Sequence, residues 1–315
     1  MIEMNCKIKH LPPELSNLPQ IKAEILYRIG NGNARPTLEG PGLDAEGNFY
    51  VCYTNHNEGG FTSIIKIDKS GKQEEFFRVT EGMAMGFAYH PDGLLFFADM
   101  MRGAIRVIDL EGNLVKEIFP RFNDKVLKVD CMEFDANGDL WFSDIDGTFY
   151  NPIGGIYLLT RDSGYEEVQL KISGLASPNG LAFSNDRSVL WVAESSANRL
   201  VRWQFKPDGS FFNNQFSPMA TYHGSGRPLI DTIRIDKSGN IYAGIMYGGR
   251  FLILDSEGIP IANVLAEGFE EGKLFYTPNL VLLPDEKKAY ALASDTEGAY
   301  ILSFETLDVA AEKHF

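Results

Sequence analysis

The chain has 315 residues, a formal net charge of −14 and a sequence pI near 4.8, which argues against a nucleic-acid-binding surface. Hydrophobic residues make up 44% of it, enough for a sizeable core, and no apolar run approaches the ~18 residues of a membrane span. The three cysteines form no even-numbered disulfide framework, and the N-terminus lacks the layout of a signal peptide, so we expect a cytoplasmic protein in a reducing compartment.

The first elements precede the repeating part of the chain. Residues 1–23 are expected to form a surface arm with a turn at Pro12-Pro13, and Glu24–Ile29 reads as a strand. Six repeats follow, each opening with a short apolar pattern and continuing through turn residues into another apolar run. They begin at Glu39, Met85, Asp130, Asn179, Asp231 and Asn279, which are 46, 45, 49, 52 and 48 residues apart. This period is typical of a propeller blade.

Each of the first five repeats divides into short runs rich in β-branched and aromatic residues, separated by Gly, Asp and Asn turns. The sixth has runs only at 279–283, 288–293 and 299–305, and its tail, 308–315, is a poor strand. We therefore expect Glu24–Ile29 to supply the missing outer strand and to cover an exposed edge.

The predicted fold is an all-β, six-bladed β-propeller with a central metal site, closed into a ring by an N-terminal strand. One domain would span residues 24–315. A seven-bladed ring and a pair of sandwiches are the alternatives. A missing seventh repeat disfavours the first and the regular period disfavours the second.

The first positions of the repeats would meet at one end of the central channel. Glu39, Asp130 and Asp231 would bring three carboxylates together, and each pair would repel by about 4 kcal/mol at ~4 Å and an effective dielectric near 20. A divalent cation would offset that repulsion, and Asn179 would add an amide oxygen. Oxygen ligands favour Ca²⁺, then Mg²⁺ or Mn²⁺, and make Zn²⁺ less suitable. The alternative is that each Asp or Asn merely forms a local turn.

Two of the six first positions lie outside this ligand set. Asn279 would either join the site, contact substrate or hydrate the channel, and Met85 would form an apolar wall. The loops after the second strands would surround the metal, and 144–155 is a candidate rim or lid. They carry four candidate substrate contacts, which are His56, Arg102, Tyr150 and Tyr247.

At these residues the chain resembles the senescence-marker protein/gluconolactonase/regucalcin-like family, which more distantly includes diisopropylfluorophosphatase and the paraoxonases. The stretch Asn151–Tyr157 looks closest to the drug-responsive lactonase branch. The resemblance runs from about residue 36 and rests on motifs in order, which are Leu38-Glu39-Gly40, Val129-Asp130-Cys131, Ser177-Pro178-Asn179-Gly180, Leu190–Leu200 and Asp231-Thr232.

The resemblance implies a six-bladed propeller that holds a catalytic Ca²⁺ or a similar ion. Glu39, Asp130, Asn179 and Asp231 match the family's ligand positions, and Thr232 matches a neighbour that can join the coordination sphere. Diisopropylfluorophosphatase and regucalcin-like members carry Asn where this chain has Asp130. That departure favours the lactonase branch over a phosphotriesterase.

The predicted function is metal-dependent hydrolysis of a lactone, a small cyclic ester, by a monomer that binds neither nucleic acid nor membrane. The metal would polarise the carbonyl, with Asp231 as general base and Asp130 as the second acid/base candidate. Two alternatives remain open: a phosphotriesterase that uses the same site, and a non-enzymatic calcium-binding propeller.

Overall fold

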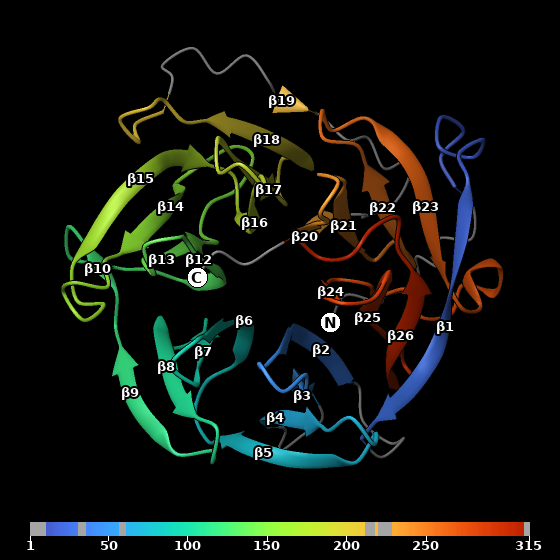
Figure 1. Cartoon of the computed structure of the whole chain (residues 1–315), viewed down its shortest axis with the longest axis horizontal. Coiled ribbons are helices and arrows are strands. Elements are labelled where there is room, and N and C mark those ends of the chain that lie inside the picture. Colours follow the sequence, from blue (N-terminus) through green and yellow to red (C-terminus); the bar gives the residue numbers. More distant parts are fainter. Residues whose placement is uncertain (1–10, 31–35, 57–60, 212–217, 220–228, 312–315) are drawn as a thin grey trace. The chain divides into compact units, whose positions relative to one another are not determined.

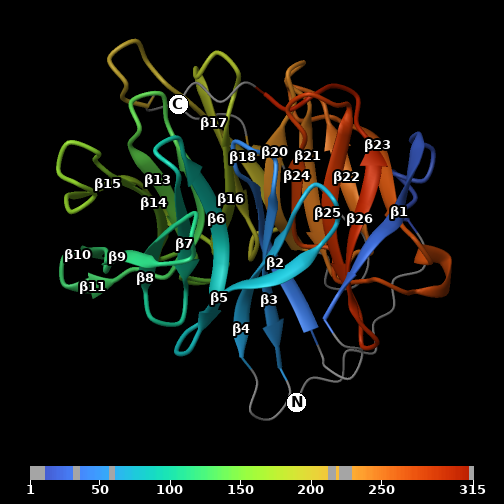
Figure 2. The same ribbon diagram turned by 60° about the horizontal axis from the view of Figure 1, so that its bottom comes forward.

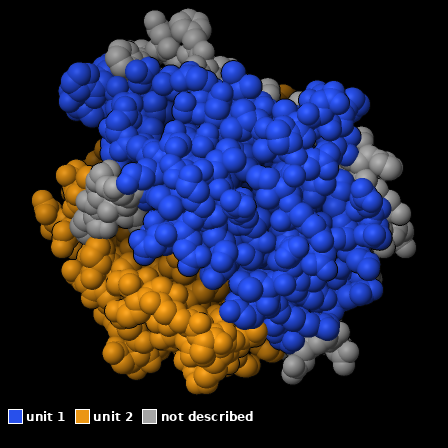
Figure 3. Space-filling model, turned by 45° about the vertical axis from the view of Figure 1, so that its right-hand side comes forward, with its two compact units in different colours: residues 1–37, 182–193, 198–312 blue, residues 38–181, 194–197, 313–315 orange. Residues whose placement is uncertain are grey.

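Figure 1 shows the computed structural model of the chain, which describes residues 11–30, 36–56, 61–211, 218–219 and 229–311. The described residues divide into two compact units, coloured separately in Figure 3. Unit 1 contains residues 1–37, 182–193 and 198–312, and unit 2 contains residues 38–181, 194–197 and 313–315. Each unit is built from β-strands, so the all-β prediction is confirmed.

Two sheets belong to unit 2, except for Pro36 and Thr37 at the start of the first one. The first has the order β2 (Pro36–Leu43), β3 (Phe49–Asn55), β4 (Thr62–Ile67) and β5 (Gln73–Val79). The second has the order β6 (Ala84–His90), β7 (Leu94–Asp99), β8 (Ala104–Asp109) and β9 (Leu114–Ile118).

A third sheet of unit 2 contains β12 (Val129–Phe134), β13 (Leu140–Asp144), β14 (Gly154–Leu159) and β15 (Val168–Leu175). A two-stranded hairpin, β10 (Arg121–Phe122) and β11 (Lys125–Val126), precedes it, and its first strand contacts β15 (Figure 2). The repeat pattern did not predict this hairpin.

A fourth sheet contains β16 (Pro178–Phe183), β17 (Val189–Glu194), β18 (Arg199–Gln204) and β19 (Pro218–Met219). The division between the two units passes through β16 and β17. The outer strand was expected at 219–223, of which 220–223 lie outside the described residues.

The remaining strands form one eight-stranded sheet in unit 1. Its order is β20 (Leu229–Ile235), β21 (Ile241–Met246), β22 (Arg250–Leu254), β23 (Pro260–Ala266), β1 (Gln20–Ile29), β26 (Ala299–Glu305), β25 (Lys288–Ser294) and β24 (Leu280–Leu282). A 3₁₀ turn, η1 (Phe269–Glu271), follows β23.

The prediction of six separate blades is therefore wrong. The described residues form four separate four-stranded sheets, and the strands expected to form two further blades are continuous in the eight-stranded sheet. The cause is β1, which begins at Gln20 rather than Glu24. Gln20–Ala23 pairs in parallel with β23, and Glu24–Ile29 pairs antiparallel with β26 as expected for the outer strand. The parallel pairing was not foreseen.

A recurrent Asp turn explains why the strands end where they do. Asp44, Asp135 and Asp236 each follow an innermost strand, and each accepts the backbone N–H four residues later, from Asn48, Asp139 and Asn240. The glycine between them has a positive φ, which an L side chain adopts only with strain.

The same aspartates also anchor the next strand. The side chain six residues after each one donates to its Oδ2 at 3.0 Å, in the pairs Tyr50–Asp44, Trp141–Asp135 and Tyr242–Asp236. An aromatic ring therefore enters the apolar layer of the sheet while its polar atom stays satisfied.

Candidate functional site

Three of the aligned first positions lie side by side in unit 2. A Cβ added to Gly40, beside Glu39, would be 1.9 Å from the carbonyl oxygen of Met85. A Cβ added to Gly86 would be 2.0 Å from the carbonyl oxygen of Asp130. Only glycine permits such close backbone approaches. β2 is thereby packed against β6, and β6 against β12.

Beta-bulges interrupt the innermost strands at the aligned positions. The register of β12 against β13 shifts between Val129 and Met132, at Asp130 and Cys131. The register of β6 shifts at Met85 and Gly86, between Ala84 and Phe87. A bulge releases residues from the ladder and re-aims a side chain, a feature common next to functional sites.

The carboxyl group of Asp130 is buried in a place where a nearby positive charge would stabilise its ionised form. It is 6% exposed, and its Oδ2 has no hydrogen-bond partner among the described residues. Burial raises the pKa of Asp130 to about 7. A buried carboxylate without a partner is unfavourable when ionised, so a cation or a transferable proton would stabilise it.

Glu39 lies on β2 and is also buried. Burial, and next the nearby Glu39 carboxylate, raise the pKa of the Cys52 thiol well above its ordinary value. Cys52 donates to the carbonyl oxygen of Met85 at 3.4 Å. Both Cys52 and Cys131 are buried.

Asn179 is buried on β16, where the chain approaches it through a strained turn. Ser177 has φ 51°, which is unusual for a residue other than glycine. Its Oγ donates to the carbonyl oxygen of Gly147 at 2.6 Å. This bond ties the 144–155 loop to the strand that carries Asn179.

Unit 1 holds the other aligned positions. Asp231 and Thr232 lie on β20 within a third bulge, between Ile230 and Ile233, and both are buried. The Thr232 N–H donates to the carbonyl oxygen of Pro278 at 3.3 Å, which brings β20 beside the segment leading to Asn279. The Asn279 Oδ1 accepts the N–H of Leu280 at 2.9 Å, so that side chain also has the local bonding of a turn former.

The residues predicted to contact substrate differ in how exposed they are and in what they contact. His56 is exposed after β3, and Tyr150 is 94% exposed at the tip of the 144–155 loop. Arg102 forms an ion pair with Glu117, and its guanidinium lies over the Phe119 ring.

Tyr247 is half-buried in the β21–β22 turn, with φ 63° and a T-shaped contact to Tyr276 at 5.4 Å between centroids. A left-handed conformation in a bulky residue is strained, so this turn is held in place by its surroundings.

Comparison with known proteins agrees with the motifs. Residues 61–266 match the model of the SMP-30/Gluconolactonase/LRE-like region. The chain belongs to this family.

Individual relatives and solved structures match this chain beyond residues 61–266. "Lactonase drp35" of Staphylococcus haemolyticus is 30% identical over 90% of this chain and 85% of its own length. The protein of the same name from Staphylococcus aureus strain MW2 is 29% identical with the same coverage. A gluconolactonase from Xanthomonas campestris has a TM-score of 0.67 at 16% identity, covering 90% of this chain and 94% of its own.

A calcium-binding protein, regucalcin, from Agrobacterium tumefaciens has a TM-score of 0.67 at 16% identity, covering 94% of this chain and 97% of its own. At such identity these two structures show a shared fold. They do not show which residues of this chain bind a metal.

The donor chemistry in unit 2 fits a hard cation of the kind that this family implies. The unpartnered Asp130 Oδ2 is a buried anionic donor, and Glu39 and Asn179 add carboxylate and amide oxygens. Across the described ranges, no group of three or more His, Cys, Asp or Glu could hold a metal by itself. Amide and hydroxyl oxygens would therefore have to complete any coordination sphere.

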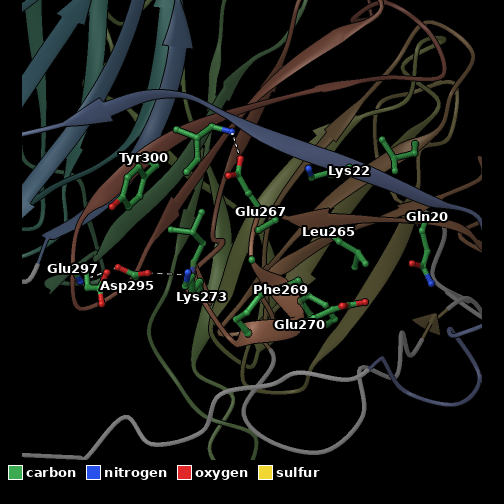
Figure 4. Close-up of a pocket in the computed structure, with 16 residues that line it drawn as sticks. Gln20, Lys22, Leu265, Glu267, Phe269, Glu270, Lys273, Asp295, Glu297 and Tyr300 are labelled. Atoms are coloured by element: carbon green, nitrogen blue, oxygen red, sulfur yellow. Dashed lines mark hydrogen bonds between the residues drawn. The ribbon is translucent and has the colours of Figure 1, made fainter.

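A pocket of about 760 Å³ lies elsewhere, in unit 1 (Figure 4). It opens where β1 passes from β23 to β26, and the Ile25 N–H donates to Glu267 Oε2 there at 3.1 Å. None of the predicted site residues lines it. Its walls carry more carboxylates than amines, and no feature of it indicates a lactone site.

No helix in the described ranges is long and apolar enough to cross a membrane.

Proposed function

We propose that this protein hydrolyses a lactone in a reaction that depends on a divalent cation, Ca²⁺ first and Mg²⁺ or Mn²⁺ next. It is a hydrolase of the lactonase kind, as its family and its relatives named lactonase indicate. The observation that carries the metal and acid/base part is Asp130, buried, unpartnered at Oδ2 and with a pKa of about 7.

The ligand set that we propose is Glu39, Asp130, Asn179, Asp231 and Thr232. It rests on the aligned repeat positions and on the family resemblance. When bound, the cation would polarise the lactone carbonyl and stabilise the negative charge that develops on its oxygen.

Proton transfer falls to the carboxylates of the chain. Asp231 is the general base that we propose for the attacking water, which adds to the carbonyl carbon as the carboxylate takes its proton. The ring C–O bond then breaks and the leaving alkoxide needs a proton. We propose that Asp130, the second acid/base candidate, donates that proton. The product is the open-chain hydroxy acid.

The test is turnover of sugar, aliphatic and aromatic lactones, measured after chelation and again with added Ca²⁺. We expect calcium-dependent hydrolysis. Asp231→Asn and Asp130→Asn should each lower kcat by about 10²- to 10⁴-fold, because general acid–base catalysis contributes that much.

Asp109→Asn is the matched control, because the Asp109 carboxylate accepts hydrogen bonds within its own turn, from Glu111 and Asn113. Full lactonase activity in Asp231→Asn would remove that residue from the mechanism. Hydrolysis of phosphotriesters with no lactone turned over would replace the proposal with the phosphotriesterase reading.

A further inference from the structure

Three buried carboxylates in unit 2 recur at one structural position that the proposed mechanism does not use. Asp99, Asp144 and Glu194 are the last residues of β7, β13 and β17, the second strands of three consecutive sheets. Their exposures are 1%, 0% and 0%. A carboxylate is seldom fully buried without a specific bonding role.

Each carboxylate accepts a backbone N–H from the segment that leads into the innermost strand of its own sheet. Asp99 Oδ1 accepts from Met83 at 3.0 Å, two residues before Met85. Asp144 Oδ1 accepts from Lys128 at 2.8 Å, two residues before Asp130.

The third carboxylate follows the same pattern. Glu194 Oε2 accepts from Ala176 at 2.8 Å, three residues before Asn179. All three bonds therefore fix the backbone just ahead of an aligned position.

In the third sheet of unit 2, backbone N–H groups on both sides of Asp130 are bonded by side chains. The Lys128 N–H, just ahead of β12, donates to Asp144, and the Cys131 N–H, within the bulge, donates to Ser143 Oγ at 3.0 Å. The peptide of Asp130 is thereby held on both sides.

Asp144 is itself held in place. Its second oxygen, Oδ2, accepts from Lys125 Nζ at 2.7 Å. Asp99 has the same arrangement, with its Oδ2 3.0 Å from Arg106 Nε. In both sheets one oxygen bonds a cation and the other bonds the inner-strand backbone, so the carboxylate has a single orientation.

The three sheets differ in the residue that follows the bonded backbone N–H group at the aligned position. Asp144 supports Asp130 and Glu194 supports Asn179, both with oxygen-bearing side chains, whereas Asp99 supports the thioether Met85. We propose that Asp144 and Glu194 are positioning residues that orient Asp130 and Asn179 for the cation. This inference rests on the proposed function and concerns the support of two of its ligands.

The test compares calcium binding, measured by titration calorimetry on the whole chain, rather than turnover. Loss of a residue that orients a ligand typically weakens metal binding by 10- to 100-fold. We expect that loss of affinity in Asp144→Ala. Asp144→Asn keeps an acceptor oxygen for the Lys128 N–H and should remain within about threefold of the wild type.

Asp99→Ala is the matched control. It removes the same bond at the same structural position, but the residue that it releases cannot supply oxygen. It should lower thermal stability and leave the calcium Kd within about threefold. Glu194→Ala and Glu194→Gln repeat the comparison beside Asn179, in case Asp144→Ala does not fold.

Several outcomes would overturn the inference. If Asp99→Ala weakens calcium binding as much as Asp144→Ala, the carboxylates act only through general stability. If the wild type binds calcium and both alanine variants at 144 and 194 bind it equally well, the inference fails and the proposed function stands. A wild-type protein that binds no calcium overturns both.

Discussion

Asp130 links the fold to the chemistry at the scale of a single residue. Folding moves its carboxyl from water into a site where Oδ2 has no partner in the described chain. The folded, metal-free protein therefore holds the proton of Asp130 to about pH 7, whereas the unfolded chain releases it near pH 4.

The pH dependence follows from that difference. Below about pH 4 Asp130 is neutral in both states and has no effect on the free energy of unfolding. As pH rises from about 4 to about 7, only the unfolded chain releases the proton, so the metal-free protein loses stability. Above about pH 7 the loss is constant, on the order of 4 kcal/mol.

Asp130→Asn should therefore stabilise the metal-free protein by up to about 4 kcal/mol at pH 8 and change it little near pH 4. Urea unfolding with a chelator present, at both pH values, measures this. The same variant should lose the stabilisation that Ca²⁺ gives the wild type, because a ligand of the native state raises its stability by mass action.

Asp109→Asn serves as control for this experiment as well. Hydrogen bonds from Asn113 lower the pKa of Asp109, so its contribution is present above the unfolded pKa and is lost as pH falls. This variant should show no gain at pH 8. A gain equal to that of Asp130→Asn would mean that relief of net negative charge, rather than burial, causes the effect.

At the scale of the element, the pairing of a turn aspartate with an aromatic residue six positions later joins three innermost strands, β2, β12 and β20, to their neighbours. Tyr242 does more than Tyr50. Its hydroxyl donates to Asp236 and also accepts the N–H of Leu307 at 2.8 Å, which fastens the segment after β26. Within the described residues, the Tyr50 hydroxyl bonds only Asp44.

Tyr242→Phe should thus cost about 1–3 kcal/mol of unfolding free energy, because it leaves the Leu307 N–H and an aspartate oxygen short of partners. Tyr50→Phe should cost about 1 kcal/mol. Denaturant unfolding measures both losses. Each variant keeps the aromatic ring and removes only the hydroxyl. Equal costs would contradict the second role assigned to Tyr242.

The sheets and the turns were accessible from the sequence because their signals are local. Gly and Asp at fixed offsets end the strands, and the repeat aligns the bulged positions. Asp144 and Glu194 were missed as supports, because the backbone N–H that each one binds lies 16 or 18 residues away and no local pattern marks it. The contacts of Tyr150 could not be predicted either, since polarity alone does not tell a pocket wall from an exposed loop tip.

At the scale of the whole molecule, the main error of the sequence-based prediction was in which strands pair with one another. Glu24–Ile29 was matched correctly to β26, but the four residues before it gave no sign that they pair in parallel with β23. Those four residues make one eight-stranded sheet out of strands expected to form two blades.

The segment before β1 belongs to the core of unit 1. Leu15 is 4% exposed and packs in a cluster with Trp191 and Ile233, and its carbonyl oxygen accepts Asn263 Nδ2 at 2.9 Å. Leu15→Ala should lower the free energy of unfolding by about 2–5 kcal/mol, as other buried leucine truncations do.

Calorimetry and denaturant unfolding measure that loss. Leu114→Ala is the control, since Leu114 is 44% exposed on β9 and should change stability by about 0.5 kcal/mol or less. If both variants behave alike, the arm is not part of the core.

The long sequence separation between β1 and its partners also has a consequence for synthesis. Ile25 bonds Glu267, 242 residues later, and Arg28 bonds Glu297, 269 residues later. At about 5–20 residues per second, β1 leaves the ribosome roughly 10–50 s before those partners exist. During that interval β1 has neither of its sheet partners, and the eight-stranded sheet is completed only once β26 has been synthesised.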